Sequence, residues 1–206
     1  MGRIFCIVGK SSSGKDTIYK KLLKNKSLRL KKIVPYTTRP IRAGEQEGVE
    51  YHFTTIEVME QLQSENKIIE CRSYDTVYGR WYYFTAKDSQ IELEKYDYLV
   101  IGTLESYIKT RDYFGEDKVV PVYIDLEDGE RLSRALKREK KQSSPKYEEM
   151  CRRFIADAKD FSKENLEKAG ITKKFDNCNL KDCTKEIENY IKSNQEQEMS
   201  NEIVRS

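Results

Sequence analysis

The feature that most constrains the fold is a glycine-rich segment at residues 9–15, which matches the pattern G-x-x-x-x-G-K. The apolar run at residues 3–8 directly precedes it and predicts a short buried strand that ends at Gly9. Residues 15–25 follow with apolar side chains at helical spacing, which predicts an amphipathic helix. A strand, a glycine-rich turn and a helix in this order are typical of a loop that wraps around phosphate groups.

The residue types in this loop suit phosphate binding. Gly9 and Gly14 allow the backbone to curl until successive N–H groups converge on phosphate oxygens. The N-terminus of the following helix adds a partial positive charge, and Lys15 supplies a full charge for the terminal phosphates. At ordinary glycine and lysine frequencies, chance produces the pattern about 0.06 times in a chain of this length. We therefore predict a nucleotide phosphate site formed by Gly9, Ser11, Ser12, Ser13, Gly14, Lys15, Asp16 and Thr17.

One position in the loop departs from the usual pattern. The residue after the lysine is normally Ser or Thr, whose hydroxyl binds Mg²⁺, whereas this chain has Asp16. A carboxylate beside phosphates repels them unless a cation lies between the two groups, so one interpretation is that Asp16 faces Mg²⁺, directly or through water. The other interpretation is an acidic residue in the first helical turn, favoured by the helix dipole alone.

A second candidate anion site lies at residues 37–45, which have the sequence T-T-R-P-I-R-A-G-E. Arg39 and Arg42 flank a proline turn, so both guanidinium groups can face one anion, and Tyr51 offers a hydroxyl to the same group. The forked guanidinium suits a phosphate monoester. Two arginines in a loop are, however, more often solvated, so the pattern does not decide the matter by itself.

The remainder of the chain predicts an α/β fold with a parallel sheet, because strands and helices alternate along it. Apolar, β-branched runs predict central strands at residues 96–101 and 119–124. Shorter strands are predicted at residues 32–34, 67–72, 77–85 and 173–178, and helices at residues 56–63, 127–141, 146–168 and 181–192.

Composition excludes several classes of protein. The 206 residues carry 38 basic and 35 acidic side chains, a net charge of +3, which argues against a nucleic-acid-binding polycation. No apolar run approaches the roughly 20 residues that span a bilayer, and the first residues do not have the pattern of a signal peptide. The five cysteines are scattered and form no C-x-x-C pair, which favours reduced thiols without structural zinc. We expect a cytoplasmic protein without a nucleic-acid or membrane partner.

Together these segments resemble the guanylate kinase family over residues 3–192. The motifs that carry the resemblance occur in the family's order and spacing: residues 9–15, residues 37–45, a G-x-x-Y-x-F run at residues 48–53, Ile69-Glu70, Tyr78-Gly79 and Arg152-Arg153-Phe154. The resemblance implies a P-loop NTPase-type core, a β-rich insertion that binds a nucleoside monophosphate, and a helical lid. It also implies transfer of the γ-phosphoryl group of Mg-ATP to GMP, and to dGMP.

The resemblance also implies boundaries within the chain. The core would comprise residues 1–34, 86–130 and 151–192, the insertion residues 35–85, and the lid residues 131–150. The lid contains six basic residues and one acidic residue between positions 131 and 141, which is either a solvated helix or a surface that closes over phosphates. Residues 193–206 are polar and are expected to form a flexible tail. Whether the protein is a monomer or a homodimer is left open.

Carried over by position, the resemblance assigns roles to individual side chains. Glu70 would accept hydrogen bonds from the N1 and N2 groups of guanine, a role that suits a buried carboxylate, although the residue alone would be taken for a surface strand position. The acceptor nucleotide would be bound by Arg39, Arg42, Tyr51, Glu70, Tyr78 and Thr103. The phosphoryl transfer would depend on Lys15, Arg39, Arg138 and Arg153. On the ATP side, Asn177 would lie near the adenine.

Three positions break the family pattern. The strand before Thr103 lacks the expected Asp-x-Asp pair, Pro35 replaces a serine, and Arg80 replaces another. We hypothesise that the lost strand carboxylate and the unexpected Asp16 are one event that keeps a carboxylate near Mg²⁺. The departures also leave open a kinase of the same fold with another nucleotide or a phosphorylated metabolite as acceptor. A non-catalytic module that binds a protein partner is a further alternative, although such modules tend to lose the phosphate loop.

Overall fold

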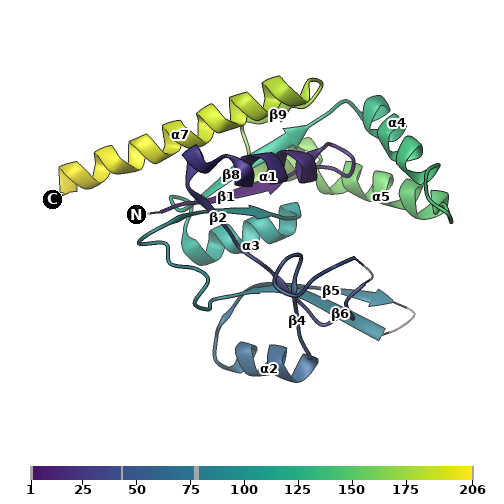
Figure 1. Ribbon diagram of the computed structural model, residues 1–206, viewed down its shortest axis with the longest axis horizontal. Coiled ribbons are helices and arrows are strands. Elements are labelled where there is room, and N and C mark those ends of the chain that lie inside the picture. The colour runs from purple at the N-terminus through teal and green to yellow at the C-terminus, as the bar shows by residue number, and fades with distance from the viewer. Residues whose placement is uncertain (1, 43, 77–78, 206) are drawn as a thin grey trace.

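The protein is described by a computed structural model that covers residues 2–42, 44–76 and 79–205, with the backbone alone for residues 198–205 (Figure 1). A parallel sheet of five strands forms its core, in the order β2-β7-β1-β8-β9. This arrangement confirms the predicted parallel α/β core. The strands are β1 (Ile4–Val8), β2 (Leu30–Lys32), β7 (Asp97–Ile101), β8 (Val119–Asp125) and β9 (Lys174–Asp176).

The central strand β1 is buried over its whole length because helices cover both faces of the sheet. Phe5 and Ile7 pack in one cluster with residues of α1 (Lys15–Lys24) and α7 (Leu180–Arg205). Ile4 and Cys6 face the other way and pack with residues of α3 (Leu104–Phe114). Successive side chains of a strand point to opposite faces, so five consecutive apolar residues satisfy both layers at once. Figure 1 shows α7 and α3 on opposite sides of this sheet.

A second, smaller sheet lies beyond α3 (Figure 1). Its four strands have the order β4-β3-β6-β5, and a small core of Met59, Phe84 and Ala86 joins it to α2. The two long strands pair antiparallel and lie in the predicted β-rich segment. The elements are β3 (Tyr36–Thr37), β4 (His52–Phe53), α2 (Ile56–Ser64), β5 (Ile68–Thr76) and β6 (Gly79–Ala86).

The helices after β8 differ from the prediction of one helix at residues 146–168. The structure has α4 (Asp128–Glu139), α5 (Tyr147–Asp160) and a separate α6 (Lys163–Lys168). The break follows from packing and capping: Phe161 is buried and stacks on Tyr123 of β8, and the Ser162 hydroxyl accepts a hydrogen bond from the N–H of Asn165, which starts α6.

Two further predictions of local structure are wrong. The strand expected at residues 32–34 is Leu30–Lys32, which follows a short 3₁₀ helix, η1 (Lys26–Leu28). The tail expected from residue 193 onward instead continues α7 to Arg205. Asn194 accepts a hydrogen bond from Arg3, and Gln195 donates to the Leu28 carbonyl and to Asp97, so the core anchors the start of this extension. Among the described residues, no helix is long and apolar enough to cross a membrane.

Leu99→Ala tests the buried sheet. Leu99 is fully buried in β7, so the substitution should leave a cavity and lower the free energy of unfolding by about 2–5 kcal/mol. Urea denaturation measures the difference. Ile155→Ala is the control, because the Ile155 side chain is 70% exposed and its loss should change stability by less than about 0.5 kcal/mol. Equal losses in the two variants would contradict the assignment of β7 to the core.

Candidate active site

The glycine-rich loop joins β1 to α1, as the sequence predicted, and its backbone leaves no room for side chains at either glycine. A Cβ atom at Gly9 would lie 2.5 Å from the carbonyl oxygen of Ile124. Gly14 has a φ angle of +91°, and a Cβ atom there would collide with the side-chain amide of Asn177. Helix α1 begins at the next residue, Lys15, so the first N–H groups of the helix belong to the loop.

Asn177 supports this loop. Its side chain is 1% exposed, and its Nδ2 donates a hydrogen bond of 2.7 Å to the carbonyl oxygen of Ser13. The contact places Asn177 at the loop but on its backbone, so the contact with adenine that the resemblance implies stays a prediction.

Charged groups surround Lys15. Burial lowers the pKa of its ammonium group below the ordinary value, whereas the Asp16 and Asp157 carboxylates oppose that shift. Asp16 and Thr17 are exposed in the first turn of α1. Within the described residues, no three His, Cys, Asp or Glu side chains converge as a metal-binding group. A cation near Asp16 would therefore take most of its ligands from phosphates and water, which is the usual environment of Mg²⁺.

Two residues that the sequence did not identify hold the loop against α4 and α5. Arg131 is 1% exposed, and its Nε donates 3.1 Å to the carbonyl oxygen of Ser11. The Asp157 carboxylate accepts 2.7 Å from the N–H of Ser11 and 3.2 Å from Arg131. Asp128 also accepts from Arg131 and from Lys10. No local pattern reveals these contacts, because 146 residues separate Ser11 from Asp157.

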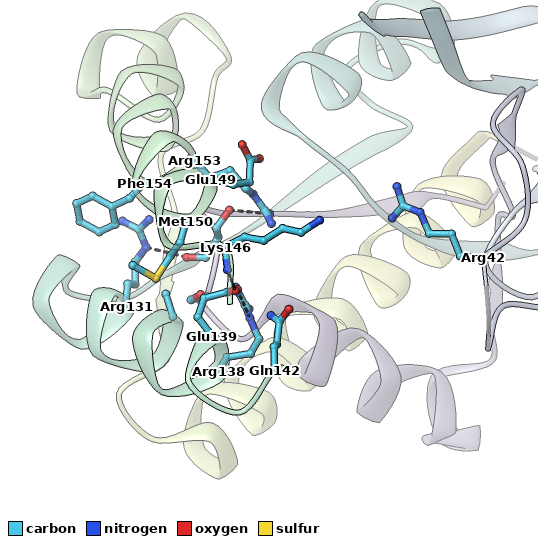
Figure 2. Close-up of a pocket in the computed structure, with 13 residues that line it drawn as sticks. Arg42, Arg131, Arg138, Glu139, Gln142, Lys146, Glu149, Met150, Arg153 and Phe154 are labelled. Atoms are coloured by element: carbon cyan, nitrogen blue, oxygen red, sulfur yellow. Dashed lines mark hydrogen bonds and ion pairs between the residues drawn. The ribbon is translucent and has the colours of Figure 1, made fainter. Parts of the chain in front are cut away.

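The loop, the two helices and the acceptor segment line one cavity of about 340 Å³ (Figure 2). Arg138 of α4 and Arg153 of α5 lie at its wall, and Arg42 reaches it from the opposite side. Arg153 donates 3.0 Å to the Ser11 hydroxyl, whereas the Arg138 side chain is 53% exposed. The structure thus brings three of the predicted arginines to one space, and the size suits a small-molecule ligand.

Arg39 is fixed before any ligand binds. Its two terminal nitrogens donate 2.7 and 2.6 Å to the two carboxylate oxygens of Glu45. Its guanidinium carbon lies 5.1 Å from the ring centre of Tyr51 and 5.5 Å from that of Phe53. Glu45 belongs to the T-T-R-P-I-R-A-G-E run but was not identified as a site residue. Tyr78, the second expected hydroxyl, lies outside the described residues.

Glu70 and Thr103, predicted on the base side of the acceptor site, are linked by Arg72. The Glu70 side chain is 3% exposed and accepts 3.0 Å from Arg72 Nε. Arg72 Nη1 donates 3.3 Å to the Thr103 hydroxyl. Arg80 does not join this group, because its guanidinium pairs with Asp75 across the exposed β5–β6 hairpin.

A sequence model described as guanylate kinase matches residues 1–194. The chain belongs to the guanylate kinase family. The guanylate kinase of Schizosaccharomyces pombe is 44% identical over 64 residues, which are 31% of this chain and 32% of that protein. The guanylate kinase of Neisseria meningitidis serogroup A is 34% identical over 116 residues, 56% of this chain and 55% of the relative. The chain thus aligns with a third to somewhat over half of these relatives' length.

The fold of this guanylate kinase family member is also that of a solved relative. The crystal structure of guanylate kinase from Anaplasma phagocytophilum has a TM-score of 0.63 and 24% sequence identity, over 94% of this chain and 86% of that one. The family and the fold class predicted from the sequence are therefore confirmed. The individual site residues stay predictions, supported where the geometry brings them together.

The Arg39–Glu45 pair should make stability depend on pH. The hydrogen bond from Arg39 lowers the pKa of the Glu45 carboxyl from 4.5 to about 2, so its stabilising effect is complete above pH 4.5 and is lost as pH falls toward 2. Glu45→Gln lacks this titration. The stability difference between the parent and Glu45→Gln, about 1.5–3 kcal/mol at neutral pH, should shrink as the pH falls from 4.5 toward 2.

Urea unfolding at each pH measures this difference. Glu164→Gln is the matched control, because Glu164 is 74% exposed and pairs with Lys168 on a helix surface, where an ion pair contributes little. A Glu45→Gln difference that stays constant across the same pH range would contradict the role given to the pair.

Proposed function

We propose that the protein is a nucleoside monophosphate kinase that transfers the γ-phosphoryl group of Mg-ATP to GMP, and to dGMP. The observation that carries the proposal is the single cavity lined by Ser11 and Ser12 of the phosphate loop and by Arg42, Arg138 and Arg153. A donor triphosphate on the loop and an acceptor phosphate near Arg42 would meet there. Membership of the guanylate kinase family supports the same assignment.

The reaction we propose is an in-line transfer without a covalent enzyme intermediate. Such a transfer needs little covalent chemistry from the protein, so positioning and electrostatic stabilisation provide most of the rate enhancement. Lys15 and the loop N–H groups would hold the donor phosphates. Arg39 and Arg42 would hold the acceptor phosphate and align its attacking oxygen with the terminal phosphorus.

Arg39 is suited to this role by its ion pair with Glu45. The two parallel hydrogen bonds fix the plane of the guanidinium, so little reorganisation is needed when a phosphate arrives. Arg42 has no such restraint in its exposed position, and it would adapt to the bound acceptor.

Arg138 and Arg153 would neutralise the charge that develops on the transferring group. Arg153 already contacts the loop through the Ser11 hydroxyl, whereas Arg138 is largely exposed. We infer that residues 131–150 act as a lid whose closure brings Arg138 to the phosphates and excludes water. Arg134 lies on the same helix as Arg138. It pairs with Glu130 and donates a hydrogen bond to the Asn177 carbonyl oxygen.

The residues near Lys15 fit a bound Mg²⁺, because Asp16 offers one exposed carboxylate beside the phosphate loop. When bound, the ion would neutralise phosphate charge during the transfer. Asp16 would hold it directly or through water, and the carboxylate would otherwise repel the triphosphate.

Asp16→Ala should lower Mg²⁺-dependent turnover by about tenfold or more, the range found when a group that supports a metal is lost. Asp16→Ser should not restore it, since a hydroxyl carries no charge and the strand before Thr103 has no carboxylate to replace that of Asp16. Steady-state kcat/KM as a function of Mg²⁺ concentration measures the effect. Asp117→Ala is the control, because Asp117 precedes β8, at the end of the parallel strands far from the phosphate loop, and is 75% exposed. An Asp16→Ser variant as active as the parent refutes the metal role.

A coupled assay of ADP release with ATP and a panel of monophosphates tests the function itself. We expect rapid turnover with GMP and dGMP and little with AMP, CMP or UMP, and the loss of turnover in Lys15→Ala. Faster turnover with another monophosphate would identify that nucleotide, and not GMP, as the acceptor. Turnover with none of them would overturn the proposal in favour of a phosphorylated metabolite or a non-catalytic module.

A further inference from the structure

An arginine occupies the base side of the proposed acceptor site. Arg72 lies on β5, two residues after Glu70, so both side chains project from the same face of the strand. Its Nε donates 3.0 Å to Glu70 Oε2, its Nη2 lies 3.5 Å from Glu70 Oε1, and its Nη1 donates 3.3 Å to the Thr103 hydroxyl. One guanidinium therefore bridges the carboxylate on β5 and the residue that follows β7.

Both charges of this pair are largely removed from water. The exposed fractions are 15% for the Arg72 side chain and 3% for that of Glu70. Burial lowers the pKa of the Arg72 guanidinium, but the Glu70 carboxylate together with Tyr74 and Tyr51 outweighs that effect, and the pKa lies above its ordinary value. A buried pair of this kind is retained only with good geometry and further hydrogen bonds, and Thr85 supplies one to Glu70 Oε1 at 3.0 Å.

We propose that Arg72 is a second specificity-determining residue, which recognises the acceptor atom at position 6 of the purine while Glu70 accepts from N1 and N2. This inference rests on the proposed function, because it concerns the base of the proposed acceptor.

The pair matches the edge of guanine in the order of its groups. Guanine offers an acceptor at O6 next to donors at N1 and N2. A guanidinium has only donors and an ionised carboxylate only acceptors, so Arg72 beside Glu70 presents the complementary series. Adenine has an amino group at position 6 and an acceptor at N1, and it would place donor against donor and acceptor against acceptor.

The hydrogen-bond distances at Glu70 indicate which contact guanine would replace on binding. A carboxylate has about four lone-pair positions, and Glu70 uses three of them for Thr85 and for two nitrogens of Arg72. The contact from Arg72 Nη2 is the longest of the three at 3.5 Å, at the limit of hydrogen bonding. Guanine would replace that contact, which frees Nη2 to donate to O6 while Nε keeps the arginine on Glu70.

Arg72 also accounts for the departure at the end of β7. The family pattern has an Asp-x-Asp pair there, and residues 99–103 of this chain contain no carboxylate. The Thr103 hydroxyl orients Nη1 and also caps α3 by accepting from the N–H of Ser106. A carboxylate at position 103 would attract the guanidinium away from Glu70, so the loss of the acid and the presence of Arg72 are mutually consistent.

Equilibrium binding without ATP tests the inference separately from catalysis. Calorimetric titration measures dissociation constants for GMP, for IMP, which lacks the 2-amino group, and for 6-thio-GMP, whose sulfur is a weak acceptor. The parent should bind GMP about tenfold more tightly than 6-thio-GMP, as the loss of one charged hydrogen bond predicts. In Arg72→Met this ratio should fall to about one.

Two further comparisons keep the test decisive. Arg72→Met leaves Glu70 unpaired and can fail to fold for that reason. In that case Glu70→Gln is compared with the double variant Glu70→Gln/Arg72→Met, in which neither side chain is charged. The preference for GMP over 6-thio-GMP should persist in the first and vanish in the second. Arg111→Ala is the control, because Arg111 is also 15% exposed and pairs with a carboxylate, on α3. It should leave the ratio unchanged.

The outcomes separate the inference from the proposed function. A purely structural Arg72 would weaken GMP and 6-thio-GMP equally and keep their ratio, which overturns the inference. A parent protein that binds no GMP at millimolar concentration overturns it as well. A parent that binds GMP with the expected preference but fails to phosphorylate it supports the role of Arg72 and contradicts the proposed function.

Discussion

The backbone of Ser11 is held at both its N–H and its carbonyl group, and the geometry of the site depends on this. Arg131 donates to its carbonyl oxygen and Asp157 accepts from its N–H, while Arg131 and Asp157 also bond to each other. The phosphate loop is thereby joined to α4 and α5 in one hydrogen-bonded group. The fully buried strand β1 fixes the other end of the loop, so the loop is held between the sheet and these two helices.

The arginines of the candidate site differ in their physical roles. Arg39 and Arg131 are buried and Arg72 is largely buried, and each bonds to a carboxylate, respectively Glu45, Asp157 and Glu70. A buried guanidinium without such a partner would cost several kcal/mol, so these pairs form part of the folded state and fix the orientation of the donors. Arg42 and Arg138 are exposed, and they retain the freedom that a closing site requires. The net charge of +3 does not reveal this arrangement, because the carboxylates that pair with these arginines cancel their charge in the sum.

The sequence predicted those parts of the molecule whose signals are local. The apolar residues 3–8, the glycine loop and the amphipathic residues 15–25 are contiguous, so the β1–loop–α1 unit was predicted almost to the residue. The break between α5 and α6 was missed, since helical periodicity continues through residues 146–168 and the stacking of Phe161 on Tyr123 is a long-range contact. Asp157 was missed for the same reason. Arg72 had a local signal, its spacing of two from Glu70 on a predicted strand, which places both on one face.

The departures from the family pattern then form a connected set. The end of β7 has no carboxylate that would draw the Arg72 guanidinium away from its place between Glu70 and Thr103. At the phosphate loop the change adds negative charge, because Asp16 places a carboxylate in a segment that usually has a hydroxyl. Each change would be unfavourable in isolation, because a lone buried charge or a carboxylate facing a triphosphate is destabilising. The charge of Arg72 is balanced by Glu70, whereas a carboxylate at position 16 beside bound phosphates requires a cation between the two groups.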